Sequence, residues 1–384
     1  MINGSNIDHS PSLHDNEEAL CQACDPTYND VFTYQNLLSS AIECTKGGVI
    51  WKSSVQMFTI NRLQWVSNLY HVLVYRQYRS KGFRSFYLNE RGKTRHIQSV
   101  HVSERAVQKA LNAFGLKAII EPKLIYDNGA SRNGKGTLFA LERLRRHLST
   151  HFRKYGKQGG VLTLDIHDYF NSIPHDKLKA MLREVIVDDD LYNQVAYFID
   201  CFEGDTGIGL GSEISQMCAI FYPNIVDHYI KEQLHIKGYG RYMDDMYIIH
   251  QDLDYLRECK EKIEQMLFDL GLTLNPKTKI TKLDGGVFVF LKRRFSLSDS
   301  GKVITRLLRK NITKRRRILK KQKKLLDQGK ADIQSIHQSY QSWRGYAFKW
   351  DTRKTVRSMD RLYYDLFNDD DPSVDKFYTP HKDK

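Results

Sequence analysis

Runs of apolar residues along the chain change their spacing several times, and each change marks an expected element. Apolar runs at 83–88 and 96–100, joined by a polar turn at 90–93, predict a two-stranded hairpin. From Ser103 onward, apolar residues recur at helical spacing, which predicts a helix behind the hairpin. The preceding stretch, 31–87, is aromatic and irregularly helical in its pattern.

A second strand-turn-helix pattern follows in "VLTLDIHDYFNSIPHDKLKAMLREVI". Its first apolar run, 161–164, predicts a strand that ends at Asp165. Pro174 stands where the first turn of a helix tolerates proline, and apolar positions from Leu178 to Val185 mark one helical face. This segment therefore predicts a strand whose end carries a carboxylate.

The stretch "GYGRYMDDMYIIHQD" predicts another hairpin. Two apolar runs, 242–243 and 246–249, are separated by Asp244 and Asp245. We therefore expect two adjacent carboxylates at the tip of a largely apolar hairpin.

Toward the C-terminus the pattern predicts an amphipathic helix at 260–270, a short strand at 287–291 and a basic amphipathic helix at 302–330. The last segment holds thirteen Lys and Arg residues, and Asp327 is its only acid. Positive charge of this density exceeds what solubility requires and favours phosphate binding.

The net charge of the whole chain points the same way. The 384 residues include 59 Lys and Arg against 45 Asp and Glu, which gives a formal net charge of +14. Such a balance favours a polyanionic partner, either nucleic acid or an anionic membrane surface. No apolar run approaches the roughly 18 residues of a spanning helix, and the first residues show no secretory pattern. We expect a cytoplasmic protein that binds nucleic acid and no membrane.

The six cysteines are scattered, so we expect reduced thiols and no disulfide framework. Cys21 and Cys24 form one CxxC pair, and His9 and His14 lie upstream of it. A structural zinc site needs four well-spaced ligands, and no second CxxC or HxxxH follows. The spacing of cysteine and histidine therefore argues against a zinc site.

Adjacent carboxylates in an apolar hairpin need an explanation, because like charges repel and resist burial. Asp165 also ends an apolar strand, so its side chain is expected to project from a strand end as those of Asp244 and Asp245 do. Three carboxylates at neighbouring strand tips are what two divalent cations need for in-line phosphoryl transfer. Two Mg²⁺ ions, or Mn²⁺ in their place, would also offset the mutual repulsion.

Two motifs resemble those of the reverse transcriptases. "YMDD" at 242–245 matches the catalytic hairpin of that family, and "LTLDIHDYF" matches its other metal-binding strand, with Asp165 as the ligand. The resemblance runs in order from about Arg91 to Phe367. It implies an α+β right-hand polymerase, with fingers, a palm whose antiparallel sheet carries the YMDD hairpin, and a helical thumb.

The resemblance also divides the chain. We expect a mobile N-terminus at 1–28, an N-terminal helical extension at 29–90, fingers and palm at 91–295, a basic thumb at 296–368 and a tail at 369–384. "FVFLKRRF" resembles the primer grip, and "SYQSWRGYAFKW" falls in the thumb. The thumb cations expected to contact nucleic acid are Arg309, Lys310, Lys314, Arg316, Arg317, Lys320 and Lys321.

Other family motifs imply contacts with the incoming nucleotide. Arg95, Arg132 and Lys135 lie in segments that resemble the two fingers motifs. "GLTLNPKTK" resembles the palm motif that closes over the nucleotide, with Lys277 a candidate proton donor to pyrophosphate. The remaining candidate nucleotide-binding residues are Asp168, Phe170, Leu210, Gly211 and Gln216.

Two of these positions bear on substrate choice. Phe170 lies five residues after Asp165, where the family has a bulky aromatic that blocks a 2′-hydroxyl, so deoxynucleotides are the expected substrates. In "GIGLGSEISQMCAIF", Leu210 stands where the commonest family pattern has glutamine, and Gln216 follows Ser215 where that pattern has proline. This form is similar to diversity-generating retroelement reverse transcriptases, and loss of the glutamine amide implies reduced fidelity.

The expected function is therefore RNA-directed DNA synthesis from dNTPs onto a primer 3′-hydroxyl. Because no ribonuclease H, endonuclease or maturase-like segment follows the thumb, the plan resembles bacterial or phage-encoded enzymes that use a dedicated noncoding RNA in antiphage defence. A protein partner or a homo-oligomer is compatible with the unexplained residues 1–90. The alternatives are a mutagenic retroelement enzyme, a template-independent or protein-primed DNA polymerase, and a non-catalytic RNA-binding scaffold. Phe170 argues against an RNA-dependent RNA polymerase.

Overall fold

The computed structural model describes residues 25–90 and 93–370. The chain divides into two compact units, Met1–Lys123 with His175–Met217 and Leu124–Pro174 with Cys218–Lys384. The expected mobile N-terminus, including Cys21 and Cys24, lies almost wholly outside the described residues, and so does most of the expected C-terminal tail.

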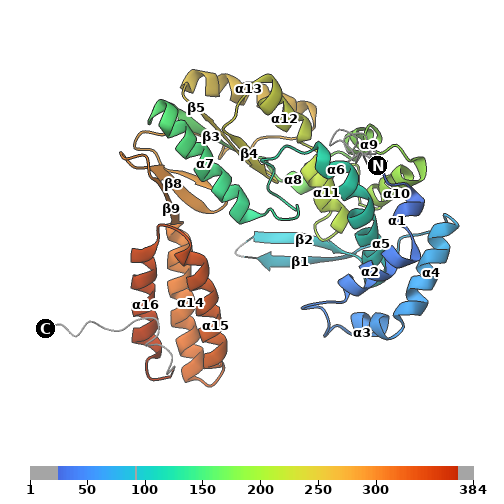
Figure 1. Cartoon of the computed structure of the whole chain (residues 1–384). Helices are drawn as coiled ribbons and strands as arrows, with labels where there is room; N and C mark the ends of the chain where they lie inside the picture. The colour runs from blue at the N-terminus through green and yellow to red at the C-terminus, as the bar shows by residue number, and fades with distance from the viewer. Residues whose placement is uncertain (1–24, 91–92, 371–384) are drawn as a thin grey trace, which may run out of the picture. The chain divides into compact units, whose positions relative to one another are not determined.

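The first unit is mainly helical and contains one hairpin (Figure 1). Its elements are α1 (Tyr28–Val31), α2 (Tyr34–Cys44), α3 (Ser53–Ile60), α4 (Arg62–Val74), β1 (Arg84–Glu90), β2 (Lys93–Ser99), α5 (Val102–Ala110), the π-helix η1 (Leu111–Leu116), α6 (Lys117–Ile120), the 3₁₀-helix η2 (Glu121–Lys123), α9 (His175–Arg183), α10 (Asp189–Asp200) and the first part of α11 (Glu213–Phe221).

The hairpin predicted from the apolar runs is confirmed, because β1 and β2 pair antiparallel from Arg84↔Ser99 onward. The helix predicted from Ser103 is also confirmed as α5, whose N-cap is His101. α9 differs slightly from the prediction. Pro174 lies immediately before the helix, and Val185 lies beyond its last residue, Arg183.

The second unit is built on a four-stranded antiparallel sheet of order β4-β5-β3-β6 (Figure 1). Val161, Tyr247 and Ile249 lie on one face and pack against Leu144 and Leu148 of α7. Because side chains alternate between faces, Leu162 and Ile248 belong to the other face and are also buried. The elements are α7 (Thr137–Tyr155), β3 (Gly160–Asp165), α8 (Tyr169–Ser172), α12 (Asn224–His228), the π-helix η3 (Tyr229–Gln233), β4 (Tyr239–Tyr242), β5 (Asp245–His250), α13 (Leu253–Asp269) and β6 (Lys279–Lys282).

A second sheet and a bundle of three helices follow along the chain. The sheet has the order β7-β8-β9, and its buried phenylalanines, Phe288, Phe290 and Phe295, join the core formed with α7. In the bundle, Leu319 packs with Tyr340 in a separate apolar core. The elements are β7 (Phe288–Phe290), β8 (Arg293–Leu297), β9 (Val303–Leu307), α14 (Arg309–Asp327), α15 (Ile333–Phe348) and α16 (Arg353–Phe367).

The prediction of one basic helix over 302–330 is wrong at its start. Residues Val303–Leu307 form β9, and the helix begins at Arg309. Their burial alternates, with Val303, Thr305 and Leu307 buried, which is the period of a strand with one face on a core. The α+β class is confirmed, and no helix among the described residues is long and apolar enough to cross a membrane.

Candidate active site

The predicted carboxylates lie at one end of the four-stranded sheet. β3 and β5 pair antiparallel, and Asp165 is the direct partner of Asp245 in that register. Directly opposed residues have Cβ atoms about 4.5–5.5 Å apart on the same face. Asp244 precedes β5 in the turn, and its carbonyl accepts a hydrogen bond from Ile166 N at 3.4 Å. The backbones of the three aspartates predicted from the sequence therefore lie together at one end of the sheet.

The turn that carries Asp244 has an unusual backbone. β4 and β5 are joined through Met243 and Asp244, with Tyr242 paired to Asp245. Met243 has φ 54, a left-handed conformation that a residue with a Cβ adopts at a cost of about 1–3 kcal/mol. Such a φ at the first position of a two-residue turn matches the twist of a hairpin. Neighbouring interactions must hold this conformation.

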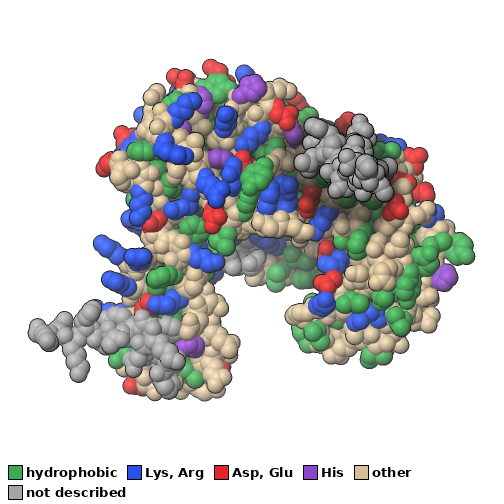
Figure 2. Space-filling model, viewed as in Figure 1, with side chains coloured by type: hydrophobic (Ala, Val, Ile, Leu, Met, Phe, Trp, Pro, Cys, Tyr) green, Lys and Arg blue, Asp and Glu red, His purple; other side chains and the backbone are tan. Residues whose placement is uncertain are grey.

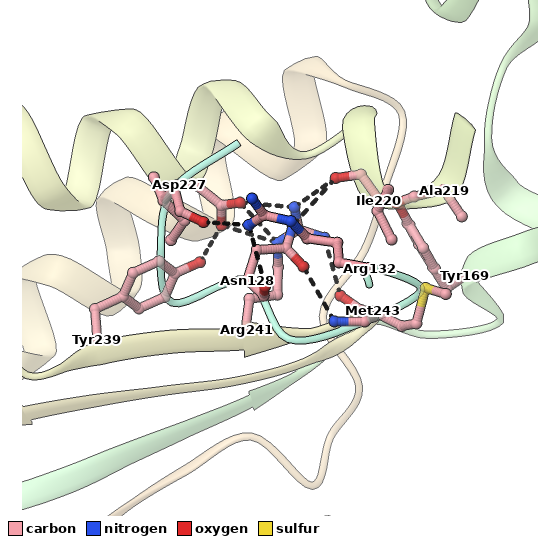
Figure 3. Close-up of polar contacts among 11 residues, drawn as sticks. Asn128, Arg132, Tyr169, Ala219, Ile220, Asp227, Tyr239, Arg241 and Met243 are labelled. Atoms are coloured by element: carbon pink, nitrogen blue, oxygen red, sulfur yellow. Dashed lines mark hydrogen bonds and ion pairs between the residues drawn. The ribbon is translucent and has the colours of Figure 1, made fainter. Parts of the chain in front are cut away.

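Arg241 supplies one of those interactions (Figure 3). Its side chain is fully buried, and Nη1 donates to Met243 O at 3.3 Å. Nη2 donates to Ile220 O at 2.7 Å and to Asp227 Oδ2 at 2.6 Å, while Nε donates to Asp227 Oδ1 at 2.8 Å. Asp227 is equally buried and accepts a further hydrogen bond from Tyr239 Oη.

The charge of Arg241 is retained despite its burial. Desolvation lowers the pKa of the guanidinium, but the adjacent carboxylate of Asp227 outweighs it and raises that pKa. A buried ion pair whose hydrogen bonds are this complete is stabilising only while both partners remain. The pair thus fixes the strand β4 and the turn to the end of α11, through Ile220 O.

The hydroxyl of Tyr169 anchors the short helix α8, which follows β3, to α11. Tyr169 is buried just after Asp168, and its hydroxyl donates to Ala219 O at 2.5 Å. Phe170 is half-buried and stacks edge-on against Tyr169, with ring centroids 5.6 Å apart. Asp168 is exposed and accepts a hydrogen bond from Asn171 Nδ2 at 2.9 Å. Because Tyr169 is anchored, Phe170 is held next to the strand end that carries Asp165.

Arg132 and Lys135 lie on a loop that pairs with the edge of β4. Gly129 N donates to Arg241 O at 3.0 Å, and Arg241 N donates to Asp127 O at 3.1 Å. Within this loop Arg132 Nη1 donates to Ile125 O at 2.9 Å, and Lys135 Nζ donates to Tyr126 O. Both predicted nucleotide-binding cations therefore brace the backbone of the loop that pairs with β4.

Asp127, on the same loop, organises a further charge cluster. It accepts hydrogen bonds from Arg143 Nε and, at 2.9 Å, from Lys231 Nζ. Burial raises the pKa of Asp127, but these cations outweigh it and the net pKa is lowered. Burial lowers the pKa of neighbouring His147 to about 4. Since Arg143 can only donate, His147 Nε2 accepts from it, and Nδ1 donates to Tyr247 Oη at 2.9 Å.

Lys277 lies in the turn that precedes β6. Asn275 N donates to Asp165 O at 2.7 Å, and the side chain of Asn275 accepts from Lys277 N at 3.1 Å. Lys277 is exposed and two residues from this contact. The structure thus places the candidate proton donor beside the carboxylate strand.

Four predicted nucleotide-binding residues belong to the first unit: Arg95, Leu210, Gly211 and Gln216. Arg95 lies on β2, and the same strand receives Leu210, whose carbonyl accepts from Gln98 N at 3.0 Å. Gly211 has φ 118, and an added Cβ would lie 3.0 Å from Gln98 O, so this position requires glycine.

The carboxylate oxygens of the three aspartates are the type of ligand that hard divalent cations such as Mg²⁺ prefer. Among the described residues, no three His, Cys, Asp or Glu side chains are grouped tightly enough to hold a metal ion by themselves. Magnesium, however, is usually held by one or two carboxylates together with substrate phosphates and water. The opposed carboxylates of Asp165 and Asp245, with Asp244 in the turn, fit that mode of binding.

The predicted cations of α14 face solvent. All seven are exposed, whereas Arg315 between them is buried and donates to Ser339 Oγ at 3.1 Å. Contact with nucleic acid by these residues stays a prediction.

The buried pair of Arg241 and Asp227 was not predicted from the sequence. A signal was present, because Tyr239 and Arg241 share one side of an apolar strand and a buried arginine requires an acid. It could not identify that acid, which lies 14 residues earlier, on α12.

A comparison with protein-family models agrees with the family expected from the motifs. A family model described as reverse transcriptase (RNA-dependent DNA polymerase) matches residues 78–285, more than half of the chain. No curated protein matches the chain. A solved structure of apo telomerase from Candida tropicalis is similar at 15% identity and a TM-score of 0.43, covering 59% of this chain and 48% of that one. The same telomerase truncated from its C-terminal domain is similar at 14% identity and 0.43, covering 63% and 59%. The match thus spans about half to three fifths of the telomerase chains.

Proposed function

Because the chain belongs to the reverse transcriptase family, we propose that it is an RNA-directed DNA polymerase. The α+β polymerase fold expected from the sequence is confirmed by that membership and by the observed sheets and helices. The observation that carries the proposal is the register of β3 and β5, which opposes Asp165 to Asp245 beside Asp244. This arrangement supports nucleotidyl transfer to a 3′-hydroxyl, with dNTPs and an RNA template as substrates.

In the proposed mechanism, Asp165 and Asp244 would hold two Mg²⁺ ions, and Asp245 would support the second. Bound there, the ions would lower the pKa of the attacking hydroxyl and neutralise charge on the triphosphate. Arg241 keeps the Asp244 turn in its left-handed conformation through Met243 O. Lys277, exposed beside the Asp165 strand, donates the proton to the leaving pyrophosphate.

Phe170 selects the sugar in this proposal. Tyr169 anchors the short helix α8 through Ala219 O, so Phe170 cannot easily retreat from the strand end. A ring held there would exclude a 2′-hydroxyl and favour dNTPs. Leu210 lacks the amide that the commonest family pattern has at this position, which supports lowered fidelity of copying.

For the biological role we propose the assignment that the resemblance of the sequence motifs implies. We place the enzyme with bacterial or phage-encoded reverse transcriptases that copy a dedicated noncoding RNA in antiphage defence. The segment around Leu210 favours a second candidate, a mutagenic enzyme of a diversity-generating retroelement. Sequencing the RNA that co-purifies with the protein separates these roles, because a single structured RNA supports the first and a repeat-derived template supports the second.

Template dependence tests the proposed activity. Each dNTP is supplied alone, with Mg²⁺ and a primer, on RNA templates of different sequence and without RNA. We expect extension only by the dNTP complementary to the first template base. Equal incorporation without RNA would replace the proposal by template-independent synthesis, and no incorporation on any template would favour an RNA-binding scaffold.

A further inference from the structure

A second basic site lies in the second unit, where α7 and β9 meet the segment between α15 and α16. There a cavity of about 900 Å³ is lined by side chains from all three places. Six of them are cations: Arg145, Lys302, Arg306, Lys349, Arg353 and Lys354. Figure 2 shows Lys and Arg side chains gathered over α7 and beside β9 near the first turns of the three-helix bundle. We call this cavity the neck site.

The acid in the neck site does not balance this charge. Asp351 is the only acid among the described residues that line it. Its carboxylate accepts from Thr305 N at 3.0 Å and pairs with Lys302 at 3.4 Å and Arg145 at 3.6 Å. Burial raises the pKa of Asp351, but these partners outweigh it and the pKa is lowered. Asp351 is therefore ionised and already paired with two of the six lining cations. The other four, Arg306, Lys349, Arg353 and Lys354, are not paired with it.

Polar groups without acceptors also lie at the neck site. α16 begins here with Thr352 as N-cap, and the Thr352 side chain makes no capping hydrogen bond to the first N–H groups of the helix. Trp350 lines the cavity, and its Nε1 has no hydrogen-bond partner in the described part of the chain. Arg293 is fully buried beside the Trp350 ring and does not line the cavity, since its guanidinium stacks on Tyr346 and donates to Tyr346 O. The donors at the cavity itself, the helix N–H groups and the indole N–H, favour an anion.

Aromatic side chains stand among these cations. The Trp350 ring lies 5.8 Å from the Arg145 guanidinium carbon and 5.5 Å from that of Arg293. Phe348 also lines the cavity and is 52% exposed. The Arg344 guanidinium carbon lies 5.8 Å from the centroid of its ring, and the exposed part of the ring can take a stacked base. Cations beside an exposed aromatic face are the combination that binds single-stranded nucleic acid.

The neck site is separate from the carboxylates. Thr137, at the start of α7, donates to Tyr242 Oη at 3.3 Å, whereas Arg145 lies eight residues further along that helix, about 12 Å at 1.5 Å per residue. β9 belongs to the three-stranded sheet and not to the sheet that carries the carboxylates. None of the seven α14 cations predicted to contact nucleic acid lines the cavity.

We propose that the neck site binds a single strand of nucleic acid outside the copying site, by its phosphates and by a base stacked on Phe348. The inference rests on the proposed function only in that the enzyme handles RNA and DNA. The strand is either a flanking part of the template RNA or the DNA product, since both present the same phosphodiester and base chemistry. The site would keep that strand on the enzyme while the carboxylates act on another segment.

The test compares a neck variant with a matched variant in the full-length protein. The neck variant carries Lys349→Ala, Arg353→Ala and Lys354→Ala, all exposed. The control carries Arg153→Ala, Lys262→Ala and Lys282→Ala, three exposed cations elsewhere in the same unit. Fluorescein-labelled 15-mers of oligo(U) RNA and oligo(dT) DNA are titrated across a range of salt concentrations, and the same proteins extend a short preformed RNA–DNA primer-template.

We expect the salt slope of the neck variant to fall by about 2, at about 0.7 per lost phosphate contact, and its affinity at 0.15 M salt to fall about fiftyfold. Extension of the short primer-template stays unchanged, and the control binds like wild type. Phe348→Ala weakens binding at least fivefold, and Phe348→Tyr restores it. A loss confined to oligo(U) assigns the site to RNA, and one confined to oligo(dT) assigns it to the product.

Equal losses in the neck and control variants, or wild-type affinity in the neck variant, would overturn the proposal. Failure of the wild type to extend any primer would instead count against the proposed function, and it would leave the difference between the two binding curves intact.

Discussion

Replacing Asp227 with alanine strips the buried guanidinium of Arg241 of its counter-ion. Two carbonyl acceptors remain, Ile220 O and Met243 O, and neither carries a charge. Removal of one partner from a buried ion pair costs about 3–5 kcal/mol. Since about 1.4 kcal/mol corresponds to a factor of ten at 25 °C, local opening of β4 should become about 10²- to 4 × 10³-fold more frequent.

Hydrogen–deuterium exchange measures that opening directly. The reporting amides are Arg241 N, bonded to Asp127 O, and Ile249 N, bonded to Gly238 O. A peptide covering 239–249 should exchange faster in Asp227→Ala by the factor given above. The matched control is Asp254→Ala, which removes an exposed carboxylate paired with Arg257 and should change exchange by less than threefold.

A double replacement separates the effect of an unpaired buried charge from the effect of losing the hydrogen bond to the turn. Asp227→Leu with Arg241→Met removes both buried charges, and such apolar replacement is often neutral or stabilising. Exchange should return toward wild type, whereas polymerisation stays reduced about three- to tenfold because the hydrogen bond to Met243 O is gone. Exchange in Asp227→Ala as slow as in Asp254→Ala would refute this reasoning.

Three further expectations concern substrate choice and pH. Phe170→Ala should admit ribonucleotides, and incorporation of single rNTPs would show it; unchanged discrimination removes Phe170 from this role. Leu210→Gln should lower the misincorporation rate, and equal rates in the two proteins would contradict the fidelity argument. His147 has a folded pKa of about 4, below the ordinary value near 6.5, so the unfolded chain binds the extra proton first as pH falls. Stability should therefore decline by about 3 kcal/mol between pH 7 and pH 4 through this residue. Thermal melting of His147→Gln should show a shallower decline, and an identical pH profile would argue against it.

The elements around the carboxylates could be predicted because their signals are local. The period of two locates β3, β4 and β5, but the turn predicted at Asp244 and Asp245 is wrong by one residue. Met243 and Asp244 form the turn, and Asp245 is the first residue of β5, because it pairs with Tyr242. The start of α14 was misplaced because the run of charge hid the alternation in Val303–Leu307. A dense run of Lys and Arg does not by itself distinguish the period of a strand from that of a helix.

The networks that brace the site could not be predicted, since their members are far apart in the sequence. Asp127 meets Arg143 after 16 residues but Lys231 only after 104. The neck site likewise joins Arg145 to Lys302 and Lys349 through tertiary packing. Sequence pattern can show that a buried charge needs a partner, but only the fold determines which residue it is.

Primer extension on an RNA template with Mg²⁺ tests the central claim most directly. The comparison is between wild type and the double change Asp244→Ala and Asp245→Ala, with exchange of the 239–249 peptide as a check on folding. The account predicts DNA synthesis by the wild type and its loss in the variant. Equal synthesis by both proteins would contradict the assignment of the carboxylates.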